Sequence, residues 1–421
     1  MRIEVVAFVL SGGKGERLMP LTKDRVKPAM PFGGSYRVID FVLSNLIHSR
    51  IRRIYILTQY EPRSLERHIY EGWTPIFGVG RYSFIRMLPP KQGSDSGWYN
   101  GTADAVNQNK NYAWENNPDI IDIFSADHIY IMDISIMNDF HYEKKADLTI
   151  SALPVKCKTA SKKYGVLVVD DDWKLIGFEE KPENPTPMPG SKDYCLASMG
   201  NYAFKPQVLI EELIIDQHKK TQRDKSIIMQ NPDRYSSHDF GFDVIPAMLK
   251  RGRKIYVYNF SENYIISTDQ HEKSYWRDIG DLDEFYQANM DLLKDEKEIN
   301  LHNERWEIFT RAACLRSPLI GEKSAISKSI ISNGCIVNGS EISNSILSYH
   351  IEVSENTNIS DSFLMGYNYV GKNVKIKNAI IDTNTYIPDN TRIGFDREED
   401  LKRKLTISDN GVVIVPRRFK L

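Results

Sequence analysis

The sequence of 421 residues lacks three features that would point directly to a partner. It has no excess of one charge, because 55 lysine and arginine residues nearly balance 56 aspartate and glutamate residues. It has no apolar run near the roughly 20 residues of a membrane span, and its longest early run covers only Val5 to Leu10. No basic segment precedes that run, which makes it a poor signal peptide. We therefore expect neither nucleic acid nor a membrane as a partner.

Cysteine is also scarce. The sequence has neither C-x-x-C spacing nor the density of a disulfide framework, and its four cysteines are Cys157, Cys195, Cys314 and Cys335. We expect free thiols in a reducing compartment, and therefore a cytoplasmic protein.

The length predicts two or three domains. The first part of the chain alternates strand-like and helix-like segments, which predicts an α/β domain with a mostly parallel sheet and helices on both faces. The expected strands are residues 4–10, 54–58, 120–124 and 148–155, and the expected helices are residues 37–47, 102–114, 244–250 and 282–293.

Three polar stretches interrupt this pattern. Four prolines between Pro182 and Pro189 predict a loop, and Lys219–Asp233 has the charged composition of an exposed excursion. The charged stretch around Asp295–Arg316 is interpreted as a linker. These features predict a first domain at residues 1–294, a linker at 295–317 and a second domain at 318–421.

The second domain has a different texture. A six-residue period with small turn residues predicts a parallel β-helix, and it is seen in the pairs Ile320 and Ile326, Val353 and Ile359, Val370 and Ile376, and Ile387 and Ile393. Several intervals slip to four or five residues, so the register is not predicted. An irregular β-sandwich is the alternative.

A glycine-rich loop, S-G-G-K-G-E-R-L, directly follows the first strand. Its glycines Gly12, Gly13 and Gly15 allow backbone N–H groups to approach an anion closely. Arg17 and Lys27 then supply two cations for a polyphosphate. The spacing fits neither G-x-G-x-x-G nor the Walker pattern, which argues against a dehydrogenase or a P-loop NTPase. A tight turn without a ligand is the alternative.

Two aspartates are candidate metal ligands. Asp127 follows the strand at 120–124, and ligands of open α/β sheets gather at the carboxyl ends of strands. Asp278 lies far away in sequence, and Mg²⁺ is commonly held by one or two carboxylates plus substrate phosphates. Sequence alone does not bring the two together, and a helix cap is the alternative for Asp127. His128 is interpreted as structural, because no second histidine stands at ligand spacing.

Two further polar stretches have structural interpretations when read alone. Glu180 and Lys181 fit an exposed charged turn. The run Ser236–Asp239 contains serine, histidine and aspartate, but adjacent residues cannot form a triad geometry, so a helix cap is preferred.

Taken together and in order, the motifs resemble the glucose-1-phosphate adenylyltransferases, or ADP-glucose pyrophosphorylases, of bacterial glycogen and plant starch synthesis. The resemblance runs from about Val5 to the carboxyl terminus. Its carriers include S-G-G-K-G-E-R-L, R-V-K-P-A-M-P-F-G-G, T-Q-Y, G-W-Y-N-G-T-A-D-A-V, A-D-H-I-Y, E-E-K-P, L-A-S-M-G, S-S-H-D-F-G and Y-W-R-D-I-G. The first of these is shared by sugar nucleotidyltransferases in general, whereas the fourth, eighth and ninth are more specific to the ADP-glucose branch.

The resemblance implies a Rossmann-like nucleotidyltransferase domain, a left-handed β-helix and a homotetramer. It implies transfer of the adenylyl group of ATP to α-D-glucose 1-phosphate with Mg²⁺ as cofactor and anionic metabolites as effectors. The implied catalytic residues are Arg17, Lys27 and Asp127, and the implied metal ligands are Asp127 and Asp278. The implied nucleotide-binding residues are Gly12, Gly13, Gly15, Gly101 and Thr102. The implied glucose 1-phosphate residues are Tyr99, Gly165, Glu180, Lys181 and Ser198, and the effector residues are Arg25 and Arg37.

Several alternatives remain open. A nucleotidyltransferase for UTP or dTTP would share most of these residues, and so would a catalytically silent regulatory subunit. An acyltransferase using the β-helix would need a general base, and His350 is the only histidine in that domain. The effector-site match departs from the members activated by fructose 1,6-bisphosphate, because Asp24 stands where they have lysine.

Overall fold

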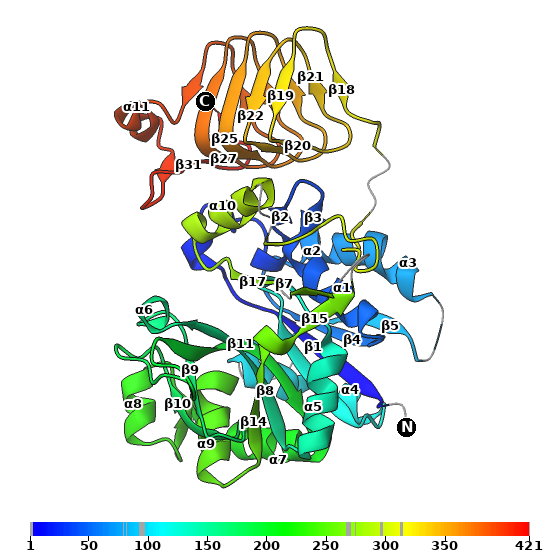
Figure 1. Cartoon of the computed structure of the whole chain (residues 1–421), viewed down its shortest axis with the longest axis vertical. Helices are drawn as coiled ribbons and strands as arrows, with labels where there is room; N and C mark the ends of the chain where they lie inside the picture. Colours follow the sequence, from blue (N-terminus) through cyan, green and yellow to red (C-terminus); the bar gives the residue numbers. More distant parts are fainter. Residues whose placement is uncertain are drawn as a thin grey trace.

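The computed structural model describes residues 3–78, 80, 82–91, 97–266, 271–273, 275–294, 298–311 and 315–420. Figure 1 shows a lower body of strands and helices and, above it, a stack of short strands. The elements from Val5 to Leu293 build the lower body, and the strands from Leu319 onward build the stack.

The lower body is built on a nine-stranded sheet. Four strands form one continuous parallel run, in the order β6 (Ile120–Ser125), β1 (Val5–Ser11), β4 (Arg53–Thr58) and β5 (Phe84–Leu88). The other five are β8 (Leu148–Lys156), β9 (Val166–Val169), β10 (Leu175–Glu179), β11 (Tyr194–Phe204) and β14 (Ile255–Asn259). The expected α/β class is confirmed. The sequence did not predict that β11 runs antiparallel to β6, β8 and β9.

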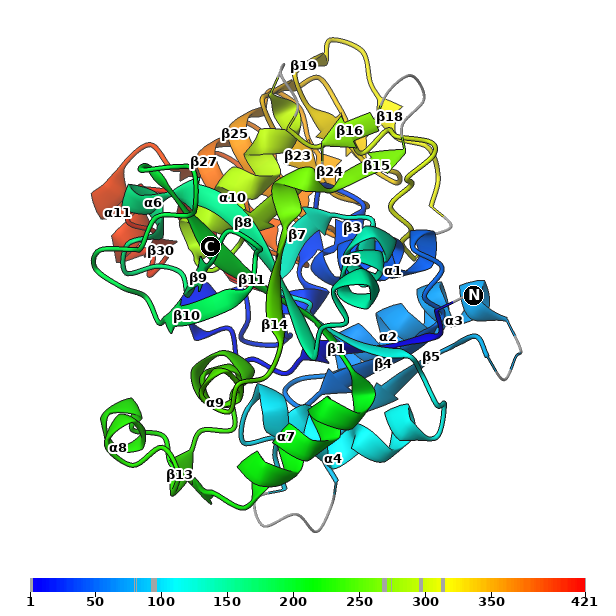
Figure 2. The same cartoon turned by 60° about the horizontal axis from the view of Figure 1, so that its bottom comes forward.

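Helices cover both faces of this sheet because β1 is apolar on both sides. Val6 and Phe8 face one core together with α4 (Thr102–Trp114) and α7 (Pro206–Gln217), which Figure 2 shows side by side. Ala7 and Val9 face the other core. That core is filled from α1 (Val38–His48) and α5 (Ile134–Lys144). Such two-sided burial is the reason the strand reads as one continuous apolar run.

Shorter elements complete the lower body. The helices are α2 (Arg63–His68), α3 (Thr74–Phe77), α6 (Cys157–Ala160), α8 (Lys225–Gln230), α9 (Ile245–Lys250) and α10 (Leu282–Met290). The strands are β2 (Pro31–Phe32), β3 (Tyr36–Arg37), β7 (His128–Ile131), β12 (Lys220–Thr221), β13 (Tyr235–Ser236), β15 (Tyr264–Ile266), β16 (His271–Lys273) and β17 (Tyr275–Asp278). The proline-rich loop is confirmed between β10 and β11, whereas the polar excursion carries a short strand and a helix that were not predicted.

The upper body is a stack of three-sided coils. Strands in successive coils pair in parallel, and Ile359, Ile376 and Ile393 occupy one buried row. Hydrogen bonds between neighbouring coils join residues 17 positions apart, for example Asn356 to Asn373. The described strands are β18 (Leu319–Ile320), β19 (Ala325–Ser327), β20 (Ile330–Ile331), β21 (Ile336–Val337), β22 (Glu341–Ser343), β23 (Ile346–Leu347), β24 (Glu352–Val353), β25 (Asn358–Leu364), β26 (Tyr369–Val370), β27 (Lys375–Ile381), β28 (Tyr386–Ile387), β29 (Arg392–Ile393), β30 (Thr406–Ile407) and β31 (Val413–Val415), with α11 (Arg397–Lys402) beside them.

The predicted aliphatic pairs occupy neighbouring sides of these coils. Three of the four pairs are fully buried. The first is different, because the side chain of Ile320 at the open end of the stack is 44% exposed. A period near six residues per side thus gives the parallel β-helix that the sequence predicts.

The stretch interpreted as a linker is not a free tether. Within the described residues 298–311, Trp306 is buried and its ring stacks on His48 at a centroid distance of 4.6 Å. Thr310 donates a hydrogen bond to Asp40 at 2.6 Å. The β-helix also packs directly on α10, where the rings of Phe285 and Phe363 are 6.0 Å apart. The connection is therefore a packed strap against the first body.

Cys157, Cys195 and Cys335 are free thiols, whereas Cys314 lies outside the described residues. Among the helices of the described ranges, none combines the length and apolar character needed to cross a membrane.

Candidate active site

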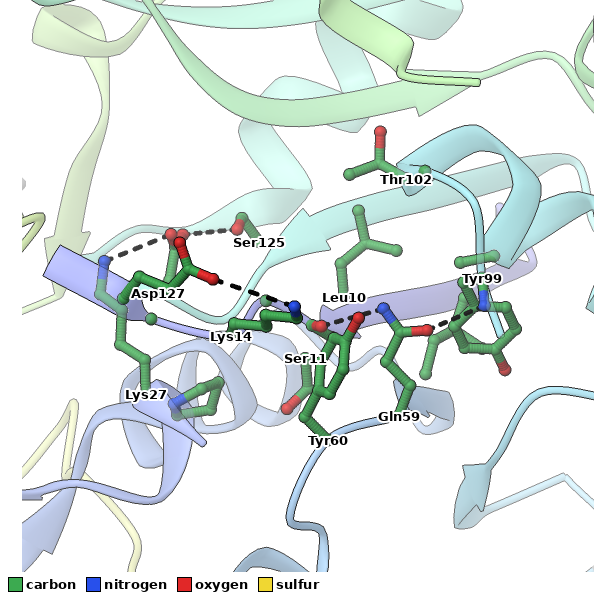
Figure 3. Close-up of a pocket in the computed structure, with 18 of the residues that line it drawn as sticks. Leu10, Ser11, Lys14, Lys27, Gln59, Tyr60, Tyr99, Thr102, Ser125 and Asp127 are labelled. Atoms are coloured by element: carbon green, nitrogen blue, oxygen red, sulfur yellow. Dashed lines mark hydrogen bonds and ion pairs between the residues drawn. The ribbon is translucent and has the colours of Figure 1, made fainter. Parts of the chain in front are cut away.

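A cavity of about 860 Å³ opens at the carboxyl ends of β1, β4 and β6. This is the edge at which ligands collect in open α/β sheets. It is lined by the glycine-rich loop and by residues from several other segments, among them residues 59–60 and 99–102, Ser125, Asp127, Arg223 and Gly280. Figure 3 shows several of these side chains from separate elements turned toward the same space.

The glycine-rich loop forms one wall. Gly15 has φ +63°, a left-handed conformation that other residues rarely adopt, and a turn over Glu16–Leu18 begins there. The hydroxyl of Thr22 donates to the carbonyl of Gly15 at 2.8 Å and fixes the loop. Gly12 and Gly13 also line the cavity, and a side chain added at Gly13 would meet no atom within 4 Å. This wall therefore leaves open space beside its backbone.

Lys27 and Asp127 form an ion pair in the cavity. The Lys27 side chain is 9% exposed, and its Nζ lies 3.2 Å from an Asp127 oxygen. Burial would raise the pKa of Asp127, but the charges of His128 and Lys27 and hydrogen bonds from Ser125 and Lys27 together hold that pKa well below its ordinary value. Asp127 is therefore ionised at neutral pH.

Arg17 and Asp278 both lie beside Gly280 at the cavity edge. Strand β17 pairs antiparallel with β7, which sets Asp278 opposite His128, the residue that directly follows Asp127. A methyl group added at Gly280 would lie 3.1 Å from the Asp278 carboxylate and 3.5 Å from the Arg17 guanidinium. The strand pairing thus places Asp278 across from the residue that follows Asp127, which sequence alone could not show.

Two carboxylates leave a cation incompletely coordinated. Within the described ranges, no group of three or more His, Cys, Asp or Glu side chains could hold a metal alone. A divalent ion at Asp127 and Asp278 would draw its remaining oxygen ligands from phosphates and water, which suits Mg²⁺.

Residues 99–102 form a second wall, held by close tertiary contacts. A side chain at Gly101 would lie 2.2 Å from the carbonyl oxygen of His238, so only glycine fits. Thr102 donates to Asp239 at 2.9 Å. Tyr99 lines the cavity, but its hydroxyl is engaged elsewhere, donating to the Leu88 carbonyl at 3.0 Å. Burial raises the pKa of Tyr99 to about 12.

The other predicted sugar-phosphate residues form a neighbouring group. Ser198 donates its backbone N–H to the Gly165 carbonyl at 2.9 Å, and a methyl group on Gly165 would lie 3.7 Å from Glu180. Glu180 forms an ion pair with Lys225 at 2.9 Å. Lys181 is exposed at φ +47°, and its side chain has no hydrogen bond or ion pair among the described residues.

The comparisons with known proteins agree with this geometry. A family model described as Nucleotidyl transferase matches residues 6–295, and one described as GlmU-like, C-terminal hexapeptide matches residues 317–415. A glucose-1-phosphate adenylyltransferase of Trichlorobacter lovleyi is 42% identical over 98% of this chain and 97% of its own length. A protein of the same name from Aliivibrio fischeri (strain MJ11) is 41% identical over 98% of this chain and 98% of its own length. Another from Geobacter metallireducens is 41% identical over 97% of this chain and 96% of its own length.

The chain belongs to the glucose-1-phosphate adenylyltransferase family. The hexapeptide match and the parallel coils together confirm the expected left-handed parallel β-helix. Members of the nucleotidyl transferase family use a divalent metal ion.

Two cavity residues of this family member escaped the sequence analysis. Gln59 donates to the Gly12 carbonyl at 3.1 Å and accepts from the Tyr99 N–H at 2.8 Å, so it joins two walls, as Figure 3 shows. Its only signal was its place in T-Q-Y. Arg223 lies in the polar excursion, whose composition gave no reason to expect it at a cavity.

The run Ser236–Asp239 is confirmed as a helix cap. The Asp239 carboxylate accepts the Phe242 N–H at 2.9 Å at the start of the helical turn over Phe240–Val244.

The two predicted effector arginines lie near the β-helix. Arg25 is buried and forms an ion pair with Asp382 of that body. Arg37 donates to the Ser64 carbonyl at 2.8 Å. Burial raises the pKa of Tyr349, and the nearby charge of Arg37 partly opposes this rise. Both arginines therefore lie where the two bodies meet.

Proposed function

We propose that this chain transfers the adenylyl group of ATP to α-D-glucose 1-phosphate, giving ADP-glucose and pyrophosphate. The observation that carries the proposal is the cavity wall in which the glycine-rich loop, Lys27 and Asp127 converge at the end of β1. The near full-length relatives named for this reaction support the choice of substrates.

The residues suit an in-line phosphoryl transfer. A phosphate oxygen of glucose 1-phosphate attacks the α-phosphorus of ATP, and the bond to the β-phosphate oxygen breaks as pyrophosphate leaves. The loop N–H groups and the cations Arg17 and Lys27 hold the phosphates of ATP and offset the charge that develops on them. Gly165, Glu180, Lys181 and Ser198 hold and orient the acceptor, and its phosphate needs no general base.

Mg²⁺ is the cofactor we infer, with Asp127 and Asp278 as its protein ligands. Both offer hard carboxylate oxygens at the cavity edge, and Asp127 is held ionised. When bound, the ion would neutralise phosphate charge and orient the reacting groups.

The test is pyrophosphate release by the full-length protein with glucose 1-phosphate, MgCl₂ and a panel of nucleotides. ATP should support turnover, and UTP and dTTP should support far less. Equal release from UTP or dTTP would contradict adenylyl transfer. No release with any nucleotide would instead favour a catalytically silent regulatory subunit.

We also infer an effector site for anionic metabolites at Arg25 and Arg37, and a homotetrameric assembly. Both arginines lie at the contact between the two bodies, where ligand binding could shift one against the other. The exposed apolar end of the β-helix, with Leu319 58% exposed, supports assembly through this body. The free thiols fit a cytoplasmic location. An effector panel on Arg37→Gln should show a changed response with the unactivated rate preserved, and light scattering on the intact chain should give the tetramer mass.

A further inference from the structure

The segment from Lys220 to Tyr235, which we call the arm, projects from the sugar-phosphate side of the first body. It leaves the end of α7, runs through β12 and α8, and returns through β13, which pairs in parallel with β12. Figure 2 shows α8 and β13 at the outer corner of this body, next to β10 and α9. Most arm side chains are exposed, although Ile228 is buried.

The base of the arm is fixed by a buried polar network. The Ser236 hydroxyl donates to one Asp216 oxygen at 2.7 Å, and His238 Nδ1 lies 2.7 Å from the other. The second ring nitrogen of His238 lies 3.0 Å from the Thr221 hydroxyl. These contacts join both strands of the arm to α7, so the arm leaves the body in a defined direction.

Two cations of the arm, Lys225 and Arg223, lie near the residues of the candidate active site. Lys225 reaches Glu180 at 2.9 Å and lies 4.4 Å from the centroid of the Phe242 ring. Arg223, two residues earlier, lines the cavity that holds Lys27 and Asp127. Lys27 forms an ion pair with Asp127, whereas the Arg223 side chain forms no hydrogen bond or ion pair within the described residues.

We propose that Arg223 binds the phosphate of the acceptor sugar phosphate, with the Lys225–Glu180 ion pair holding the arm in position. This inference rests on the proposed function. Lys225 holds the arm to Glu180, one of the proposed sugar-phosphate residues, and Arg223 two positions earlier lines the cavity. A guanidinium there offers two parallel N–H donors to a phosphate, a geometry that an ammonium cannot supply. Arg223 would thus supply a cation for the acceptor phosphate, whereas the glycine-rich loop serves the phosphates of ATP.

The decisive measurement is the pair of Michaelis constants of the full-length enzyme. Arg223→Gln should raise KM for glucose 1-phosphate by about tenfold to a hundredfold, because a charge-assisted hydrogen bond is lost. The KM for ATP should change by less than about threefold, and Arg223→Lys should restore part of the loss. Arg234→Gln is the matched control, since Arg234 belongs to the same arm but stacks over Tyr235 at 5.3 Å and does not line the cavity.

Unchanged constants in Arg223→Gln would overturn the proposal, as would a larger rise in KM for ATP than for glucose 1-phosphate. These outcomes differ from failure of the proposed function, in which the unmodified enzyme itself would release no pyrophosphate from ATP and glucose 1-phosphate.

The role of the tether is tested by combining Arg223→Gln with Lys225→Gln. If the ion pair positions Arg223, removing Lys225 first should shrink the effect of Arg223→Gln on KM for glucose 1-phosphate. Strict additivity of the two changes would overturn the tether.

Discussion

The two halves of the active site are held in different ways. On the ATP side, Lys27 is buried and paired with Asp127, and Gln59 donates to the Gly12 carbonyl of the glycine-rich loop. On the sugar-phosphate side, Lys181 is exposed without a partner in the described chain, and Glu180 is paired only with Lys225 of the arm. The first half is therefore organised before any ligand binds, and the second is completed by its ligand.

This difference matches the chemistry of each half. Charge develops around the α-phosphorus, so fixed cations and N–H groups are most effective there and need no rearrangement during the reaction. The acceptor must enter and ADP-glucose must leave, which favours groups that exchange partners. We expect changes in the first half to alter turnover and stability, and changes in the second to alter KM.

The largest effect should come from the metal ligands. Asp278→Asn and Asp127→Asn should each lower kcat by at least about a hundredfold at saturating Mg²⁺, because the charge that holds the ion and the phosphates is lost. The matched control is Asp171→Asn in the exposed turn between β9 and β10, which should keep normal turnover. Near-normal kcat in Asp278→Asn would remove this residue from the metal site.

The next effect separates the two halves by KM. Lys181→Gln should raise KM for glucose 1-phosphate by about 10- to 150-fold, the range of one charge-assisted hydrogen bond, and change KM for ATP much less. Lys162, exposed and paired with Glu183, provides the control as Lys162→Gln. A larger change in the ATP constant would move Lys181 to the other half of the site.

A stability measurement sharpens the same contrast. Lys27→Met should lower the stability of the first body by about 1–2 kcal/mol, because it leaves the Asp127 carboxylate without its buried partner. Lys181→Met should leave the unfolding midpoint nearly unchanged, since its side chain is exposed. Urea unfolding of both variants compares them directly, and equal midpoints would show that the ion pair does not organise the free enzyme.

The same pair gives a pH dependence with a definite sign. The pKa of Asp127 is lowered in the folded state, so its contribution is present above the unfolded value of about 4. That contribution is lost as the pH falls toward the folded pKa. The difference between the unmodified enzyme and Lys27→Met should therefore shrink below about pH 4.

Local patterns in the sequence predicted much of the first half. The apolar run, the glycines and the following cations lie within one stretch, and α4 begins and ends at the predicted residues 102 and 114. Asp278 was a candidate from its own motif and from the family resemblance, but its place beside the chain at Asp127 depends on the pairing of β17 with β7, which no local pattern encodes.

The remaining features depend on tertiary contacts alone. Gly101 is required because the chain at His238 passes 2.2 Å from the place of a side chain. Trp306 was assigned to a linker because its neighbours are charged, yet it packs against His48. Arg223 lies in a polar segment like many exposed ones, and only the folded arm brings it to the cavity. The composition of a segment therefore does not predict the role of its residues when that role depends on contacts with distant parts of the chain.

The smallest effect concerns Asp122. This residue lies within β6 and Asp127 follows the end of that strand, but the two carboxyl groups have opposite ionisation at neutral pH. It is fully buried, one oxygen accepts from Asn138 at 2.9 Å, and the other has no partner among the described side chains. Burial raises the pKa of Asp122 to about 8, although the Asn138 hydrogen bond lowers it somewhat. The folded state therefore keeps this proton where the unfolded chain loses it, so the contribution of Asp122 to stability falls as the pH rises from about 4 to about 8. Asp122→Asn removes the titrating carboxyl group. The urea midpoint of this variant should therefore rise relative to that of the unmodified enzyme as the pH increases from about 4 to about 8, and the difference should stay constant above about pH 8. Parallel midpoints from pH 5 to pH 8 would mean that Asp122 titrates alike in the folded and unfolded chains, and the contrast between Asp122 and Asp127 would be lost.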